Sequence, residues 1–136
     1  MKFDLNAPIL PSMGAAGISL GASITELTQK NNFLSDNYFK RLESDYIVYR
    51  FESVTLWTTD SLVSQISVHN KYRGKLLNDI HIGIPKSSVE KKYGSFVLDI
   101  EDNLIIGSIN GVCFEFDVES AVGEITEIFV YDRYIK

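Results

Sequence analysis

Three side chains in this 136-residue sequence are suited to acid–base or nucleophilic chemistry: His69, His81 and Cys113. A catalytic histidine needs a carboxylate that orients its ring and a pocket that receives a substrate. Asp79 stands near His81 in the sequence, so His81, Asp79 and Cys113 form the catalytic set of one alternative function, a small hydrolase. We interpret both histidines as surface or hydrogen-bonded structural residues, with His69 at the outward position of a strand end.

Cys113 is flanked by Val112 and Phe114, which are typical strand residues. Reactive thiols stand in electropositive surroundings that stabilise the thiolate. Glu115 and Asp117 fall on the same strand face as Cys113 and are expected to raise the pKa of its thiol. We therefore predict an inert, half-buried thiol and assign no catalytic residue.

Acidic side chains accumulate in the C-terminal half of the chain. The segment Asp99-Ile-Glu-Asp-Asn103 lacks the central glycine and terminal glutamate of a calcium-binding loop, and no phosphate-binding Gly-Lys-Ser/Thr ending follows the N-terminal glycines. No metal or cofactor is therefore expected. Two interpretations stay open for the acidic residues: a solvated strand face with turn tips, or a surface that binds a basic protein partner. The candidate binding residues are Asp99, Glu101, Asp102, Glu115, Asp117 and Glu119.

The composition is that of an acidic globular protein. A net charge of −5 and a pI near 5.0 argue against nucleic acid as a partner, because phosphate binding needs clustered Lys and Arg. A single cysteine rules out an intrachain disulfide and fits a reducing compartment. No apolar run approaches the roughly 20 residues that span a bilayer, and the N-terminus lacks the features of a signal peptide. We expect one cytoplasmic domain that binds no membrane, and the oligomeric state stays open.

The stretch Ile18–Lys30 recurs at Ile80–Lys92, an offset of 62 residues from Ile18 to Ile80. A repeat of this kind is a structural unit that buries its apolar face against its neighbour. The predicted organisation is an N-terminal arm at 1–16, repeat one at about 17–74 and repeat two at about 79–136. The same offset, without a gap, matches Val63 with Ile125, Ile66 with Ile128, Val68 with Val130, and Tyr72 with Tyr134.

Each repeat is predicted to begin with a short strand and one short helix. Ser23 and Glu26 form a capping box at the start of the first helix, in which each residue bonds a backbone N–H of the other. Ser87 and Glu90 repeat this box in the second helix, which ends at Gly94.

An antiparallel meander follows each helix, so the predicted fold class is α+β. We expect the two meanders to join into one curved antiparallel sheet, in preference to two sheets packed face to face. Residues 30–40 are predicted to be irregular, and 109–111 a tight Asn-Gly turn. Strands are predicted at 17–21, 46–51, 54–58, 62–69, 96–100, 104–107, 112–118 and 125–131.

The run Ala7-Pro-Ile-Leu-Pro-Ser12, followed by Gly17-Ile-Ser-Leu-Gly21 and its tandem copy, resembles small immunity proteins of bacterial polymorphic toxin systems. Contact-dependent growth inhibition systems are the main example. The Ile-x-Ile-Gly helix unit is also similar to the repeat unit of the small lipoprotein of the outer-membrane β-barrel assembly machine. This chain differs from that lipoprotein in lacking its signal and its lipidated cysteine. Neither family supplies binding residues.

The resemblance to immunity proteins implies a cytoplasmic protein that neutralises a cognate toxin domain by occluding its active site or contributing a strand edge. Nuclease toxins are commonly basic, and an acidic inhibitor associates quickly with a basic partner. The alternatives are a small hydrolase that uses His81, Asp79 and Cys113, and a small-ligand-binding structural module. A large apolar pocket between the repeats would favour the module.

Overall fold

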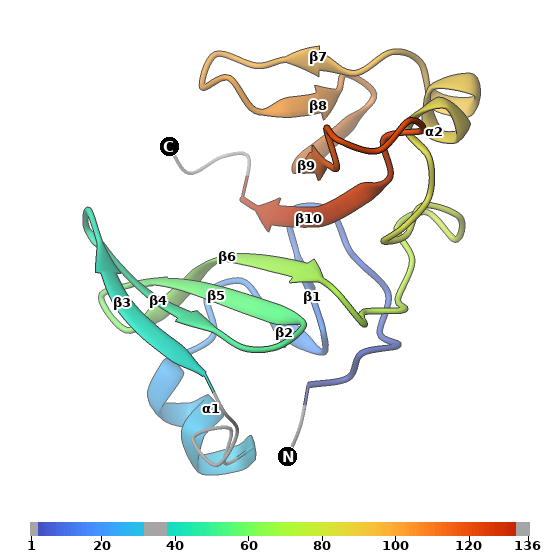
Figure 1. Cartoon of the computed structure of the whole chain (residues 1–136). Coiled ribbons are helices and arrows are strands. Elements are labelled where there is room, and N and C mark those ends of the chain that lie inside the picture. Colours follow the sequence, from blue (N-terminus) through green and yellow to red (C-terminus); the bar gives the residue numbers. More distant parts are fainter. Residues whose placement is uncertain (1–2, 32–37, 133–136) are drawn as a thin grey trace.

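The computed structural model describes residues 3–31 and 38–132 and has an α+β fold dominated by one antiparallel sheet (Figure 1). The strand order in that sheet is β3-β4-β5-β6-β10-β9-β8-β7. Each half of the chain contributes one meander, and the meanders join in a continuous sheet, as predicted. The strands are β3 (Phe39–Glu43), β4 (Tyr46–Arg50), β5 (Val54–Thr59), β6 (Leu62–His69), β7 (Val97–Leu98), β8 (Leu104–Ile106), β9 (Ile109–Phe116) and β10 (Ile125–Tyr131).

The two meanders meet where β6 runs antiparallel to β10. Ile66 pairs with Val130, and Val68 pairs with Ile128. All four side chains are fully buried, because alternate residues of a strand point to the same face and this face is covered. The β-branched residues of both strands therefore stabilise the junction between the halves.

The first helix, α1, spans Ile24–Asn31. The Glu26 amide donates a hydrogen bond to Ser23 Oγ at 3.3 Å, which is one of the two bonds of the predicted capping box. Ile24 and Leu27 pack against the core from one side of the helix. No helix in the described part of the chain is long and apolar enough to cross a membrane.

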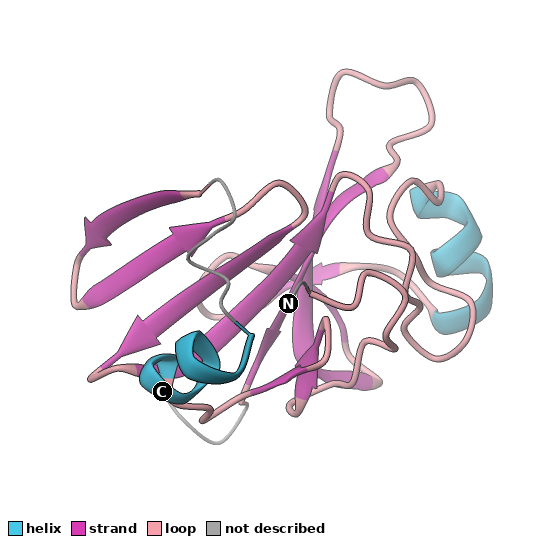
Figure 2. Ribbon diagram, turned by 90° about the horizontal axis from the view of Figure 1, so that it is seen from below, coloured by secondary structure: helices cyan, strands magenta, loops and turns pink. Residues whose placement is uncertain are grey.

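The second helix, α2, spans Lys86–Tyr93 and lies at the other end of the molecule (Figure 2). Its predicted capping box is wrong, because α2 starts directly after Pro85 and has no side-chain cap. A proline with its fixed φ is suited to the start of a helix, so the predicted cap serine falls inside the first turn. Glu90 instead accepts a hydrogen bond from the Phe96 amide at 3.1 Å. Gly94 ends the helix as predicted, with φ at 98°.

The N-terminal segment forms a small sheet of β1 (Gly14–Ala15) and β2 (Ile18–Ser19). Tyr72, in the connector between the halves, fastens this segment in place. Its hydroxyl donates to the Ala7 carbonyl at 2.5 Å and accepts from the Ala16 amide at 2.9 Å. Burial raises the pKa of Tyr72 to about 12, so the proton that this bond needs is retained near neutral pH.

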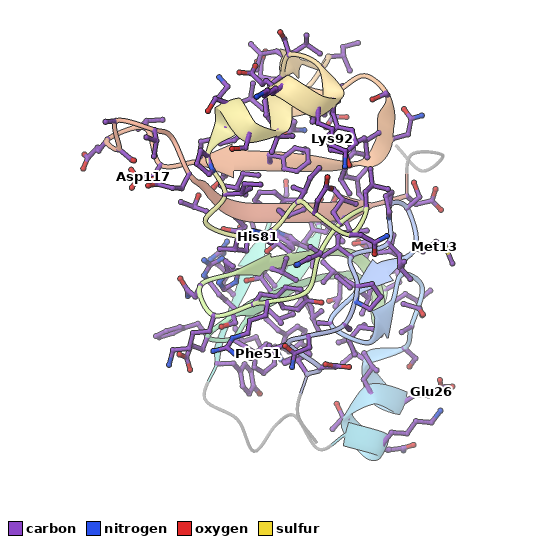
Figure 3. The ribbon with its side chains drawn as sticks, turned by 90° about the vertical axis from the view of Figure 1, so that its right-hand side faces the viewer. Met13, Glu26, Phe51, His81, Lys92 and Asp117 are labelled. Carbon is purple, nitrogen blue, oxygen red and sulfur yellow. The ribbon has the colours of Figure 1, made fainter. Side chains whose placement is uncertain are left out.

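The large sheet has a buried inner face and a partly exposed outer face. Core side chains such as Leu56, Ile66 and Ile128 lie on the inner face, together with apolar residues of both helices and of the N-terminal segment. Figure 3 looks at this side, with α2 and the segment that carries His81 in front of the strands. Side chains at the alternate positions of each strand point to the outer face. The outer face includes Val48, Arg50, Thr55, Trp57, Gln65, Ser67, His69, Cys113, Glu115, Glu127, Phe129 and Tyr131.

Backbone bonds between each helix start and the last strand of its meander recur at the offset of 62. In the strand that precedes the last strand of each meander, the offset is different. Ser67 pairs with Thr55, and its counterpart Phe129 pairs with Cys113, which is 58 residues after Thr55. The stretch between α2 and Cys113 is shorter than its counterpart, and the longer connection before β10 restores the offset, so the alignment needs two compensating gaps. The matched Tyr134 lies outside the described residues. The recurring bonds run from Gly21 to Val63 and Gly83 to Ile125, from Val63 to Ala22 and Ile125 to Ile84, and from Ile24 to Ser61 and Lys86 to Gly123.

Strand β3 corrects the prediction of an irregular segment at 30–40. Phe39 and Lys40 begin β3, which pairs with β4 in a hairpin that turns at Ser44, a residue with φ of 56°. Residues 32–37 of that segment lie outside the described residues. The residues Phe39-Lys-Arg-Leu-Glu43 do not alternate between apolar and polar, which hid the strand, because an exposed edge strand lacks the apolar alternation of a half-buried one.

Strand β9 corrects the prediction of a turn at 109–111. The strand already begins at Ile109, and the turn falls at 107–108. Gly111 has φ of 86° and lies against Ser12, whose amide donates to the Gly111 carbonyl at 3.4 Å. The glycine at position 111 therefore allows the N-terminal segment to approach the strand closely, and it does not form a hairpin turn. The strand also ends earlier than predicted, which leaves Val118 93% exposed.

Candidate functional site on the outer face of the sheet

Polar side chains line up across the middle of the outer face. In one row Arg50 of β4 lies opposite Thr55 of β5, which lies opposite Ser67 of β6. In the next row His69 of β6 lies opposite Glu127 of β10. We call these five residues the polar cluster. All except Arg50 are buried, although they belong to the less covered face.

Hydrogen bonds connect the polar cluster. Arg50 Nη1 donates to Thr55 Oγ1 at 3.1 Å and lies 3.4 Å from Glu127 Oε2. Ser67 donates to the same carboxylate oxygen at 2.5 Å, a length typical of a charge-assisted bond. The Glu127 side chain is 11% exposed and the Arg50 side chain 37%. The pair is thus screened from water on the carboxylate side and open to it on the guanidinium side.

His69 completes these connections through Nε2, which lies 2.9 Å from Thr55 Oγ1. Because arginine can only donate, Thr55 accepts from Arg50. The Thr55 hydroxyl can donate to His69 Nε2 or accept from it, so the direction of this bond depends on the tautomer of the ring. The other ring nitrogen is Nδ1. That buried nitrogen has no hydrogen-bond partner among the described residues.

Burial and neighbouring charges set the protonation states of the cluster. Burial lowers the pKa of His69 and Arg50 lowers it further, while Glu127 acts in the opposite direction. The nearby backbone carbonyl of Glu52 also favours the charged form of the His69 ring. It is not placed to form a hydrogen bond with Nδ1 of that ring. Glu115 lies opposite Glu127 on β9, and burial, then repulsion by Glu127, raises the pKa of Glu115.

Cys113 lies on the outer face opposite Phe129. Its thiol is buried, and burial, followed by the charges of Asp99 and Glu115, raises the pKa of Cys113 to about 12. The predicted direction is confirmed, with Asp99 acting where Asp117 was expected. A thiol that stays protonated is a poor nucleophile.

Two aromatic rings adjoin the polar cluster. The ring centroids of Trp57 and Phe129 are 5.8 Å apart, with the rings inclined at 52°. Both side chains are half-buried, as is Tyr131, two residues along the same strand from Phe129. Partly exposed Trp and Tyr beside an arginine are the residue types that are enriched at protein-binding surfaces.

Three of the predicted acidic binding residues gather near this surface. Glu115 belongs to the outer face, and the charges of Asp99 and Glu101 act on Cys113 together with that of Glu115. The C-terminal half of the outer face is therefore electronegative.

The other three acidic candidates occupy turns. Asp102 lies in the β7–β8 turn with φ of 63°. Asp117 and Glu119 belong to the connection between β9 and β10, which projects from the sheet in Figure 3. There the Glu119 amide donates to Asp117 Oδ1 at 3.0 Å, so these carboxylates form turn tips as well as a charged surface. The six candidates do not form one patch.

The predicted hydrolase residues are not assembled. Asp79 accepts hydrogen bonds from Lys92 Nζ and the Tyr93 hydroxyl of α2, at 2.5 and 2.7 Å. His81 Nδ1 lies 2.9 Å from a neighbouring backbone carbonyl. Since α2 packs on the inner face and Cys113 belongs to the outer face, the sheet separates the thiol from Asp79.

The arrangement of the polar cluster suits binding better than catalysis. In the Ser-His-Asp type of nucleophilic catalysis, the hydroxyl bonds the imidazole and the imidazole bonds the carboxylate. Here Ser67 bonds the carboxylate and Thr55 bonds the imidazole, and both hydroxyl residues are fully buried. Within residues 3–31 and 38–132, no group of three His, Cys, Asp or Glu side chains is placed to hold a metal ion.

Sequence reasoning missed most of the polar cluster. The predicted place of His69, at the outward position of a strand end, is confirmed, and of the two predicted roles the hydrogen-bonded structural one is the role it has, because the residue is 2% exposed and bonds Thr55. One signal was available: Gln65, Ser67 and His69 alternate with apolar residues along β6 and so share a face. The sequence does not indicate that Glu127 pairs with that face.

Comparison with known proteins finds no family model, curated protein or solved structure that matches this chain.

Proposed function

We propose that this protein is an immunity protein that binds and neutralises a basic bacterial toxin domain with the outer face of its sheet. The observation that carries the proposal is the partly exposed Trp57–Phe129 pair beside the polar cluster. Aromatic side chains with few rotatable bonds lose little entropy on binding, and they dominate the energy of many interfaces. The cluster holds the neighbouring Arg50 in a fixed orientation.

Charge supports a basic partner. The chain carries a net charge of −5, and Asp99, Glu101 and Glu115 lie on the C-terminal side of the aromatic pair. Long-range attraction raises the encounter rate of such a surface with a cationic protein. Neutralisation follows if the toxin contacts the outer face with the surface that carries its own active site.

Strand addition at β3 is the less favoured form of this binding. All five residues of β3 are exposed, and β3 is an edge of the sheet, which is the geometry that accepts an added strand. Arg41 is paired with Glu43 at 2.7 Å, however, so Lys40 leaves this edge with a net positive charge that would repel a basic strand. We therefore assign the contact to the outer face.

We also infer that the two halves are copies of one unit. The bonds that recur at an offset of 62 support this, as does the shared order of helix and meander. On the inner face the copies agree, with Ile66 matching Ile128 and Val68 matching Val130. On the outer face of β6 and β10 they differ, and the pairs are Gln65 and Glu127, Ser67 and Phe129, and His69 and Tyr131. Binding specificity then belongs to the divergent face. The proposed compartment is the cytoplasm, where a buried free Cys113 stays reduced.

The proposal is tested by affinity capture from the source cell with matched charge reversals. Glu101→Lys changes a residue near the outer face, and Glu26→Lys makes the same change on exposed α1. We expect the parent chain and Glu26→Lys to capture one basic toxin domain and protect cells that express it, and Glu101→Lys to lose at least part of both. His81→Ala should retain protection. Equal loss with both charge reversals, or capture of no basic protein, would contradict the proposal.

A further inference from the structure

An open depression of about 580 Å³ lies beside Arg50, at the end of β4, where the core residue Phe51 also lines it. Pockets for small organic ligands have volumes of this order and combine apolar walls with a few fixed polar groups. Tyr38 and Phe51 lie in ring contact, with centroids 5.1 Å apart, and Phe39 is 82% exposed. The lining residues are Tyr38, Phe39, Arg50, Phe51, Glu52 and Asn70.

Arg50 is prepared to bind an anion in this depression. Its Nη1 is held by Thr55 and Glu127, which fixes the plane of the guanidinium. Among the described residues, Nη2 and Nε of Arg50 have no hydrogen-bond partner, and the side chain is 37% exposed. A guanidinium with two adjacent donors matches the two oxygens of a carboxylate. Fixing the group beforehand lowers the entropy cost of binding.

The remaining charges around the depression limit the ligand to a single negative charge. Glu52 is paired with Lys71 Nζ at 2.8 Å, and its side chain is 68% exposed, so this carboxylate is neutralised at the rim. Glu127 already offsets part of the charge of Arg50. These two ion pairs leave the site with no net charge, so a phosphate dianion would add two uncompensated negative charges, whereas a monocarboxylate adds only one.

We propose that this depression binds a small aromatic monocarboxylate. Its carboxylate accepts hydrogen bonds from Nη2 and Nε of Arg50, and its ring packs against Phe39 and Tyr38. Binding here does not require the proposed toxin contact, although Arg50 belongs to both surfaces. The site requires no residue of a second protein.

The test uses 3-phenylpropionate as the probe and 3-phenylpropanol, which has the same ring and no charge, as its control. Titration into the full-length isotopically labelled chain should give saturable shifts of the amide signals of Phe39, Phe51 and Asn70. We expect the alcohol to bind about tenfold more weakly, because it lacks the charge-assisted bonds. Arg50→Lys retains the positive charge without the paired donors. It should weaken the binding of 3-phenylpropionate by a similar factor.

A matched pair of exposed variants keeps the test independent of the polar cluster. Phe39→Ala removes a wall of the depression, and Leu42→Ala makes a comparable truncation at a 77% exposed position of the same strand. Affinity for 3-phenylpropionate should fall about fivefold or more with Phe39→Ala and stay unchanged with Leu42→Ala. The proposal is overturned by equal affinity for acid and alcohol, by shifts that do not saturate, or by equal effects of the two truncations.

Discussion

Glu127 of β10 lies directly opposite His69 of β6, with both side chains buried at the line where the two halves of the sheet meet. Arg50 and Thr55 connect the same two residues through β4 and β5. The junction is therefore apolar on the inner face and hydrogen-bonded on the outer face. A substitution in the polar cluster should therefore change the stability of the whole sheet.

Stability should decline in mild acid because of His69. Burial lowers the pKa of His69 in the folded chain, while the unfolded ring titrates near 6.5, so the unfolded state binds more protons below about pH 7. Stability is complete above the unfolded pKa and falls as the pH drops through it. The free energy of unfolding of the parent chain, measured with urea, should be about 1 kcal/mol lower at pH 5.5 than at pH 7.5.

His69→Gln should flatten that pH dependence, and His81→Gln, outside the polar cluster, should leave it unchanged. The raised pKa of Glu115 acts with the opposite sign, since the folded state then holds its proton more tightly than the unfolded state. That contribution stabilises the fold as the pH falls through the folded pKa of Glu115. The same slope in the parent and in His69→Gln would contradict the assignment.

Ser67→Ala should destabilise the fold by about 1–3 kcal/mol, because it removes the 2.5 Å bond to Glu127 and leaves a buried carboxylate oxygen less well satisfied. The measurement is the midpoint of urea unfolding, compared between variants whose dependence of the free energy of unfolding on urea concentration is the same. Ser87→Ala, at an exposed position of α2, is the control and should change stability by less than about 0.5 kcal/mol. Equal effects of the two substitutions would show that the Ser67 bond contributes little.

Gly74→Ala should cost about 2–3 kcal/mol, since a Cβ at this position would overlap the Ala7 carbonyl and approach the Tyr72 ring to 2.6 Å. The same substitution at Gly107 meets no atom within 4 Å and should be nearly neutral. Thermal unfolding of the two variants compares them directly. A neutral Gly74→Ala would mean that the N-terminal segment does not pack against the connector as described.

Cys113 should react slowly with a thiol-specific disulfide reagent at pH 8 in the folded chain. Burial and the surrounding carboxylates raise the pKa of Cys113 to about 12, so hardly any thiolate is present. The urea-unfolded chain, with an ordinary exposed thiol, should react at least about a hundredfold faster. Rapid labelling of the folded chain, at a rate near that of the unfolded chain, is the contrary result.

Local sequence patterns predicted the strands whose apolar residues alternate. β6 matches its predicted span, and β10 does too, because each has one face in the core. The patterns failed at β3, an exposed edge strand, and at Gly111, where an Asn-Gly pair serves a close approach instead of a turn. At Gly111 a contact with a segment distant in the sequence overrode the local turn preference. At β3 the exposed edge has no covering contact that would produce an apolar pattern.

The sequence by itself determined the inner face, because the alternation of Ile66 and Val68, repeated at Ile128 and Val130, requires one buried side on each strand. It also determined the acidity of the chain and the α+β class. Only the tertiary structure decided that Arg50, His69 and Glu127 share a hydrogen-bonded cluster. Those residues come from three strands, and the pairing of β6 with β10 that unites them joins segments about sixty residues apart. The energy of that pairing comes from the apolar residues on the inner face, so the pattern of the polar ones could not predict it.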